Sequence, residues 1–277
     1  MSILKRHIST RELYGECLTF IPSAAQLDQF EADMKILNPT MLRDSLKEAA
    51  ETRKLQGVPS PQQRRLIHRI YARKINEMSS MYPFVFTVEN SLRSALAEHL
   101  GSHFDRLDWW VIVRDFQRAG KDPSSLGHIR GKTVNARFLK SVWRALENIV
   151  AAEKIQLIDG PDKTDEFFYC TTLGDIWEMT RADWSLTRGM FSSDQQLGYK
   201  LDQTMFNNTM RLIKDARNEL FHSNPIKNRA RVIEACERIL DALDVHLGDL
   251  AADLAAVSYV PIAPSVARTA RHLIPAR

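Results

Sequence analysis

The apolar residues of this chain recur every three to four positions along most of its length, and no segment alternates convincingly with a period of two. In residues 82–104, for example, one stripe at helical spacing carries Val85, Val88, Leu92, Leu96 and Leu100. Side chains at i, i+3 and i+4 share one face of an α-helix, whereas those of a strand alternate between two faces. The spacing therefore predicts an all-α fold, a bundle of about six to eight helices.

Two residue pairs, Asn38-Pro39 and Ser60-Pro61, mark helix starts. An Asn or Ser side chain accepts a hydrogen bond from the first turn, and proline fits the first helical position, where its missing N–H costs nothing. These pairs predict helices at 38–55 and 60–81. The same periodicity predicts further helices at 82–104, 105–120, 133–154, 174–184, 197–224 and 228–257.

The helix expected at 133–154 carries a predicted core face of Phe138, Val142, Leu146 and Val150. A polar, basic connection is expected before it, at 121–133. A loop or a minor extended piece is expected after it, at 159–173.

The domain organisation follows from length and from one linker signal. The 277 residues suffice for one large domain with an accessory piece. The segment 56–62, QGVPSPQ, is rich in Gly, Pro and Ser, as linkers are. We therefore expect an accessory helical segment at 1–60, a main helical bundle at 61–257 and an exposed basic tail at 258–277.

The composition describes a folded protein with a small positive excess. Hydrophobic residues make up 44% and charged residues 26% of the chain, and the net charge is +4. That excess is compatible with an anionic partner such as RNA without requiring one. The start of the chain lacks the apolar core of a signal peptide, and no apolar run has the length of a membrane helix. We expect a cytoplasmic protein that does not bind a membrane.

Neither the cysteines nor the histidines form a pattern that binds metal. Cys17, Cys170 and Cys236 lie far apart, which argues against a disulfide framework and against a structural zinc site. His99 and His103 are four residues apart, but no cysteine or acidic pattern completes a known ligand set around them. The sequence predicts neither a metal site nor a cofactor.

The stretch GHIRGKT at 127–133 resembles a phosphate-binding loop only superficially. The pattern G-x-x-x-x-G-K-[ST] needs a glycine where this chain has Leu126, and no hydrophobic strand precedes it. Two interpretations remain for this connection. Its basic side chains contact RNA phosphates, with Lys121, Arg130 and Lys132 as the candidates, or they are simply solvated.

The stretch ARNELFHSNPI, near residue 220, carries the groups that metal-free RNA cleavage needs. His222 has the side-chain type that takes and gives protons near neutral pH. Arg217 offers a planar fork that matches a phosphate and stabilises negative charge as it develops. Asn218 and His222 are four residues apart and share a helical face.

Spacing alone does not distinguish these residues from an ordinary helix end. A cation in the last turn of a helix interacts favourably with the helix dipole, so Arg and His are common there. The chain also contains a second Arg-to-His pair at similar spacing, Arg93 and His99.

The context of the motif resembles the HEPN (higher eukaryotes and prokaryotes nucleotide-binding) domains, in particular the Abi-like (abortive-infection-like) group. Their signature is an arginine followed by a polar residue, a short spacer and a histidine at the end of a long helix, here Arg217, Asn218 and His222. The helix at 82–96 resembles their early helix, which has an aromatic-rich start followed by an acidic residue and an arginine, here Glu89 and Arg93. The resemblance covers about residues 80–250.

The resemblance implies a metal-independent endoribonuclease that dimerises so that two motifs face one cleft. Arg217 and His222 would be catalytic, and Asn218 would help to orient them or the phosphate. Glu89 would pair with Arg217 or Arg93 and fix the geometry, or it would form only a surface salt bridge with Arg93. The resemblance also implies a role in phage defence or as a toxin, with an antitoxin or a defence protein as partner.

One departure concerns control of the activity. Some HEPN toxins carry a tyrosine three residues after the histidine, which a nucleotidyltransferase antitoxin modifies, whereas this chain has Pro225 there. Two other functions stay open. The chain is a non-catalytic HEPN module that binds nucleotide, RNA or a partner protein, or it is a helical scaffold in which the motif is accidental.

Overall fold

A computed structural model describes residues 23–56, 63–160, 166–222, 224, 226 and 228–247. Within these ranges the regular structure is helical apart from one short hairpin, which confirms the predicted all-α fold. No helix of this part of the chain is long and apolar enough to cross a membrane. The predicted helix start at Ser60-Pro61, the stop at Pro225, the basic tail at 258–277 and most of the linker lie outside the described residues, as do the first 22 residues of the accessory segment.

The longer helices of the first half are α2 (Ala24–Ile36), α3 (Pro39–Gln56), α4 (Gln63–Ser79), α5 (Tyr82–His103) and α6 (Trp110–Arg118). The short 3₁₀ helix η2 (Pro123–Ser125) follows, and then the hairpin of β1 (His128–Ile129) and β2 (Lys132–Thr133). The second half contains α7 (Ala136–Glu147), α8 (Ala152–Asp159), α9 (Glu166–Cys170), α10 (Leu173–Ala182), α11 (Trp184–Thr187), η3 (Arg188–Met190), α12 (Asp194–Leu197), α13 (Gln203–Phe221) and α14 (Arg229–Ala242).

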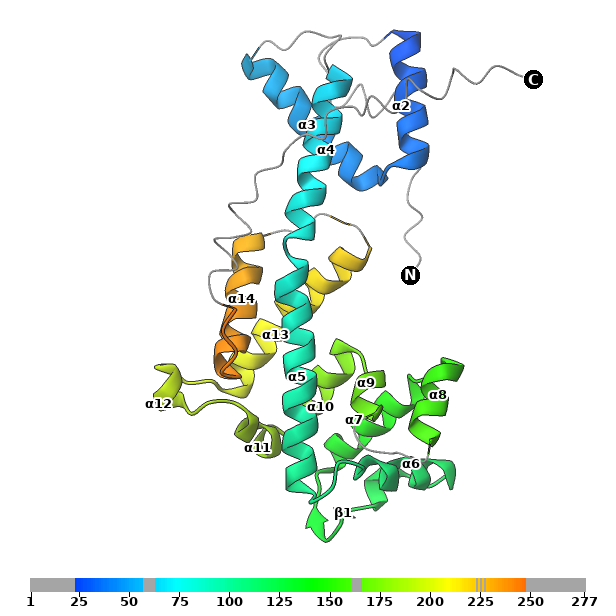
Figure 1. Ribbon diagram of the computed structural model, residues 1–277, viewed down its shortest axis with the longest axis vertical. Coiled ribbons are helices and arrows are strands. Elements are labelled where there is room, and N and C mark those ends of the chain that lie inside the picture. The colour runs from blue at the N-terminus through cyan, green and yellow to red at the C-terminus, as the bar shows by residue number, and fades with distance from the viewer. Residues whose placement is uncertain are drawn as a thin grey trace, which may run out of the picture.

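Helix α5 is the central element of the main bundle (Figure 1). The apolar stripe predicted for it is buried, and Leu92 at its middle is fully buried. Helices α13, α14 and α10 all pack against α5. At the C-terminal end of α5, Trp109 and Trp110 are buried among the aromatic rings of Phe104, Phe138, Phe167 and Phe168.

A second, smaller hydrophobic cluster joins α2, α3 and the first half of α4. Its fully buried residues include Leu42 and Leu46 of α3, and Ile67 of α4 packs against them. The start of α3 confirms the predicted cap, because the Oδ1 of Asn38 accepts hydrogen bonds from the N–H groups of Thr40 and Met41 at 3.0 and 3.1 Å. The boundary near residue 60 stays a prediction, and the structure places the start of α4 with α2 and α3.

Several predicted boundaries were wrong. The helix expected at 133–154 is two helices, α7 and α8, separated where Ala151 adopts an extended conformation. Val150 lies in this break and is 80% exposed, so it does not belong to the predicted core face. The periodicity continued through the break, because a pattern of apolar residues carries no information about a local change of backbone direction.

The remaining corrections concern segment types and ends. The predicted loop at 159–173 contains the helix α9, and the connection at 121–133 contains the two-stranded hairpin. The helix expected at 197–224 starts only at Gln203, where the side chain of Asp202 caps it by accepting from the N–H of Met205 at 2.8 Å. Helix α14 ends at Ala242, earlier than the predicted 257.

Two substitutions test the core assignment. Leu92→Ala should lower the free energy of unfolding by about 2–5 kcal/mol, because it leaves a cavity in the centre of the bundle. Val150→Ala should change it by less than about 0.5 kcal/mol, since Val150 is exposed in the break between α7 and α8. Urea unfolding followed by circular dichroism measures both. Equal losses for the two variants would contradict the assignment of Val150 to the surface.

Candidate functional site

The motif residues lie at the C-terminus of α13. The face of α13 that carries Met210, Ile213 and Leu220 is buried against the bundle. Arg217 lies at the edge of that buried face, and its side chain is 28% exposed. His222 is the C-terminal capping residue, and its backbone N–H donates to the carbonyl of Asn218 at 3.0 Å.

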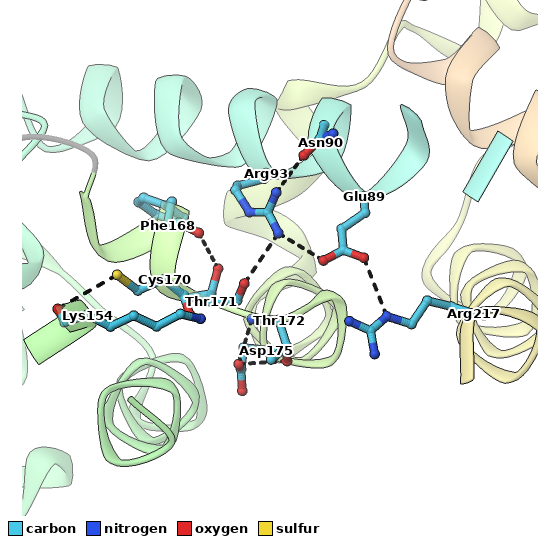
Figure 2. A network of polar contacts seen from close by, with 10 residues as sticks. All are labelled: Glu89, Asn90, Arg93, Lys154, Phe168, Cys170, Thr171, Thr172, Asp175 and Arg217. Carbon is cyan, nitrogen blue, oxygen red and sulfur yellow. Dashed lines mark hydrogen bonds and ion pairs between the residues drawn. The ribbon is translucent and has the colours of Figure 1, made fainter. Parts of the chain in front are cut away.

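Glu89 of α5 lies between two arginines (Figure 2). Its Oε1 accepts a hydrogen bond from the Nη2 of Arg93 at 2.9 Å, and its Oε2 lies 3.6 Å from the Nε of Arg217. The Glu89 side chain is only 15% exposed. Both partners suggested by the sequence therefore contact Glu89 at once, so this carboxylate connects α5 to α13.

Arg93 extends the network to α10. Its guanidinium donates to the Oδ1 of Asn90 at 2.7 Å and to the backbone carbonyl of Thr171 at 3.3 Å. The next residue, Thr172, caps α10 in a reciprocal arrangement with Asp175. The position of Glu89 is thus fixed to the start of α10 as well as to α13, as Figure 2 shows.

Arg217 is held on its other side by an aromatic ring. The guanidinium carbon lies 4.1 Å from the centroid of the Phe221 ring, which is a close cation–π contact. Tyr82 of α5 packs its edge against Phe221 and donates a hydrogen bond to the carbonyl of Leu220 at 3.3 Å. The sequence analysis missed Phe221 and Tyr82, although Phe221 follows Arg217 at i+4, the spacing at which helical side chains meet.

Asn218 and His222 are both exposed, and no hydrogen bond of either side chain to a described residue is present. At 3.6 residues per turn their directions differ by about 40°, whereas those of Arg217 and His222 differ by about 140°. Among the residues that the structure describes, no hydrogen bond joins Arg217 to His222. One chain therefore presents Asn218 and His222 on one side of α13 and Arg217 on another.

The three weaker candidates for RNA contacts lie elsewhere. Lys132 forms an ion pair with Asp105 at 3.3 Å and bonds to the carbonyl of His103, at the far end of α5. Arg130 is in the left-handed turn of the hairpin, and Lys121 lies over the Phe116 ring. Fourteen residues of α5 separate His103 from Glu89, about 21 Å along the axis. The structure does not bring these cations to the motif.

The histidine pair considered as metal ligands has other contacts. The Nε2 of His99 is 2.7 Å from the carbonyl of Leu186. The pKa of His103 lies below its usual value because burial disfavours the charged ring, and the positive charges of Lys132 and His99 add to this effect. In the described part of the chain, no group of three or more His, Cys, Asp or Glu side chains has a metal-binding arrangement.

Two surface cavities near α13 have opposite electrostatic character. A cavity of about 500 Å³ between α3, α13 and α14 is lined by the acidic residues Asp44, Asp215 and Glu219. A cavity of about 480 Å³ between α7, α10 and the start of α13 is lined by the basic residues Arg137, Lys140, Arg144 and Arg181. Neither Arg217 nor His222 lines either cavity.

Comparisons with known proteins add no assignment: no family model, no curated protein and no solved structure matches this chain. The resemblance to HEPN domains therefore remains a prediction from the sequence.

The burial of Glu89 leads to a testable difference in coupling energy. In a double-mutant cycle, Glu89→Gln and Arg93→Met should couple by about 1 kcal/mol or more, because both side chains are largely shielded from water. The coupling of Glu89 to Arg217 should be smaller than this, since 3.6 Å is too long for a hydrogen bond. Urea unfolding of the single and double variants measures these energies.

The matched control is the pair Glu234 and Arg238, which has the same i, i+4 spacing and the same 2.9 Å separation but lies exposed on α14. Its coupling should be about 0.5 kcal/mol or less. If the Glu89–Arg93 pair couples no more strongly than this control, the network contributes nothing beyond an ordinary surface ion pair.

Proposed function

We propose that the protein is a metal-independent endoribonuclease of the HEPN type that acts as a homodimer. The observation that carries the proposal is the fixed position of Arg217. Its guanidinium lies between the Glu89 carboxylate and the Phe221 ring, one turn before an exposed histidine. A structural helix-end cation needs neither a buried carboxylate from another helix nor an aromatic platform.

The charges around Arg217 support binding of an anion. Glu89 carries one negative charge and is shared between two arginines, so the group of three retains one positive charge. A phosphate would be attracted to a cation that is already oriented. Because Arg217 loses its side-chain freedom on folding, less entropy is lost when a substrate binds.

The proposed chemistry is attack of a ribose 2′-hydroxyl on the adjacent phosphate. His222 takes the proton of the 2′-hydroxyl or gives one to the leaving 5′-oxygen. Arg217 stabilises the negative charge of the pentavalent transition state, and Asn218 orients the phosphate or the catalytic pair. The oxygen–phosphorus bond to the 2′-oxygen forms as the bond to the 5′-oxygen breaks. The products are a 2′,3′-cyclic phosphate and a 5′-hydroxyl.

The proposed dimer would use an exposed aromatic patch beside the motif. Tyr82, Phe86 and Phe221 form this patch, with exposed fractions of 40%, 67% and 60%. Tyr82 and Phe86 are one turn apart on α5, and Tyr82 contacts Phe221. Aromatic rings exposed to water at one place are typical of protein interfaces. A second copy packed on this patch would lie next to Arg217.

The first test is RNA cleavage by the purified protein, with and without chelator. The wild-type protein should leave 2′,3′-cyclic phosphate ends, and His222→Ala and Arg217→Ala should each reduce the rate by about 10²–10⁴-fold. His246→Ala is the matched control, because His246 is an exposed histidine beyond the end of α14. Mass spectrometry of the fragments identifies the ends.

The outcomes separate the candidate functions. Cleavage by His222→Ala at the wild-type rate would contradict the assigned mechanism. If RNA stays intact in the presence of a correctly folded dimer, the proposed endoribonuclease activity is contradicted altogether. RNA or nucleotide binding without cleavage would then favour the non-catalytic module.

The second test concerns the aromatic patch. Phe86→Glu should shift the protein towards monomer and reduce cleavage in proportion, because a carboxylate in an apolar interface would lose its hydration. Tyr169→Glu is the control, since Tyr169 is an exposed aromatic residue of α9 outside the patch. Analytical ultracentrifugation measures the monomer fraction. A wild-type monomer, or a dimer unaffected by Phe86→Glu, would exclude this interface.

A further inference from the structure

Three cations of α7 border the basic cavity between α7 and α10. Arg137, Lys140 and Arg144 follow one another on the exposed side of α7, and none forms an ion pair with a residue of the described part of the chain. Spacings of three and four residues place all three on one helical face. Such a face could simply be solvated, as many charged helix faces are. The cavity that it borders requires a more specific explanation.

Both acidic residues of the cavity are already satisfied. The carboxylate of Asp175 accepts from the Nδ2 of Asn148 at 2.9 Å and from the backbone and hydroxyl of Thr172. Glu178 pairs with Arg181 at 2.8 Å. Arg181 offsets the charge of Glu178, whereas Asp175 keeps its negative charge because its hydrogen-bond donors are neutral. The four basic and two acidic side chains of the lining leave a net charge of +2. The cavity keeps an excess of positive charge together with polar side chains such as Asn207 and Gln203.

A line of cations runs from this cavity to the motif. Trp177 of α10 donates to the Oδ1 of Asn207 at 2.9 Å, so its indole lies at the edge of the cavity. Arg181 and Lys214 each lie 5.3 Å from the centroid of the Trp177 ring. Lys214 precedes Arg217 by three residues on α13. From Asn207 to Arg217 the helix rises about 15 Å, a span that a strand of a few nucleotides covers.

We propose that the cavity between α7 and α10 binds backbone phosphates of the RNA strand whose scissile phosphate lies at Arg217. The inference rests on the proposed function, which it deepens by assigning the direction in which the strand leaves the site. Arg137, Lys140 and Arg144 contact phosphates, and Lys214 bridges the interval to Arg217. The acidic cavity on the other side of α13 repels the strand and excludes the opposite path.

The experiment measures binding of a short single-stranded RNA that carries 2′-O-methyl groups throughout and so cannot be cleaved by 2′-hydroxyl attack. The triple variant Arg137→Ala/Lys140→Ala/Arg144→Ala should bind this RNA about tenfold more weakly. The slope of log affinity against log salt should fall by about two, because three phosphate contacts are lost. Fluorescence anisotropy across a salt series gives both quantities.

The matched control is Lys35→Ala/Arg65→Ala/Arg69→Ala, which removes the same residue types, two arginines and one lysine, from exposed positions of α2 and α4. It should leave the affinity and the salt slope unchanged. Equal losses in both triples, or no loss in either, would overturn the proposal. Adenosine monophosphate should not displace the RNA. Displacement by the mononucleotide as effective as by the oligonucleotide would indicate a nucleotide site and overturn the strand path.

Cleavage of unmodified RNA distinguishes this inference from the proposed function. The α7 triple should raise KM and leave kcat nearly unchanged, because its contacts are the same in the ground state and the transition state. If the α7 triple binds RNA more weakly but the wild-type protein never cleaves RNA, the phosphate-binding role of the cavity is supported and the proposed endoribonuclease activity is contradicted. If the α7 triple has normal KM and normal RNA binding and its cleavage still depends on His222, the phosphate-binding role of the cavity is contradicted. The proposed endoribonuclease activity is then unaffected.

Discussion

Helix α5 packs against α10, α13 and α14, and this packing largely shields the charge of Glu89 from water. A carboxylate shielded from water stays ionised only where cations or hydrogen-bond donors replace its hydration. Glu89 receives one cation from its own helix and a second from α13. The contacts that keep this carboxylate satisfied also fix the end of α13 relative to α5. Through Arg93 and the carbonyl of Thr171, they fix the start of α10 as well.

The arrangement of Arg217 follows from the same constraint. An arginine at a helix end is normally a long, mobile side chain, whose ordering costs entropy when it binds an anion. Here the carboxylate of Glu89 and the ring of Phe221 restrict it from two sides before any ligand arrives. Phe221 is itself supported by Tyr82. The beginning of α5 thus contributes both a charged partner and an aromatic support to one side chain of α13.

Local signals in the sequence predicted the parts of the structure that local physics determines. The Asn38 cap and the buried stripe of α5 were predicted correctly because capping and helical periodicity depend on neighbouring residues. The pairing of Glu89 with Arg93 was expected from their i, i+4 spacing, whereas its pairing with Arg217 was expected only from the resemblance to HEPN domains. Val150 and the break between α7 and α8 were missed because the apolar periodicity continues through a local change of backbone direction. Arg137, Lys140 and Arg144 share one face of α7 at helical spacing, but the cavity was missed because linear spacing does not show that α10 and α13 lie beside this face.

The two sides of α13 differ in charge, and this difference bears on how the motif could work. On an ideal helix, Asp215, Glu219 and His222 lie within about 60° of one another, whereas Arg217 faces roughly the opposite way. A phosphate attracted to Arg217 would therefore lie away from the histidine of the same chain and away from the acidic cavity. Proton transfer at that phosphate requires a histidine that reaches it from another direction. A second copy packed on the aromatic patch beside Arg217 would supply one, which is the physical reason why the proposed site needs two chains.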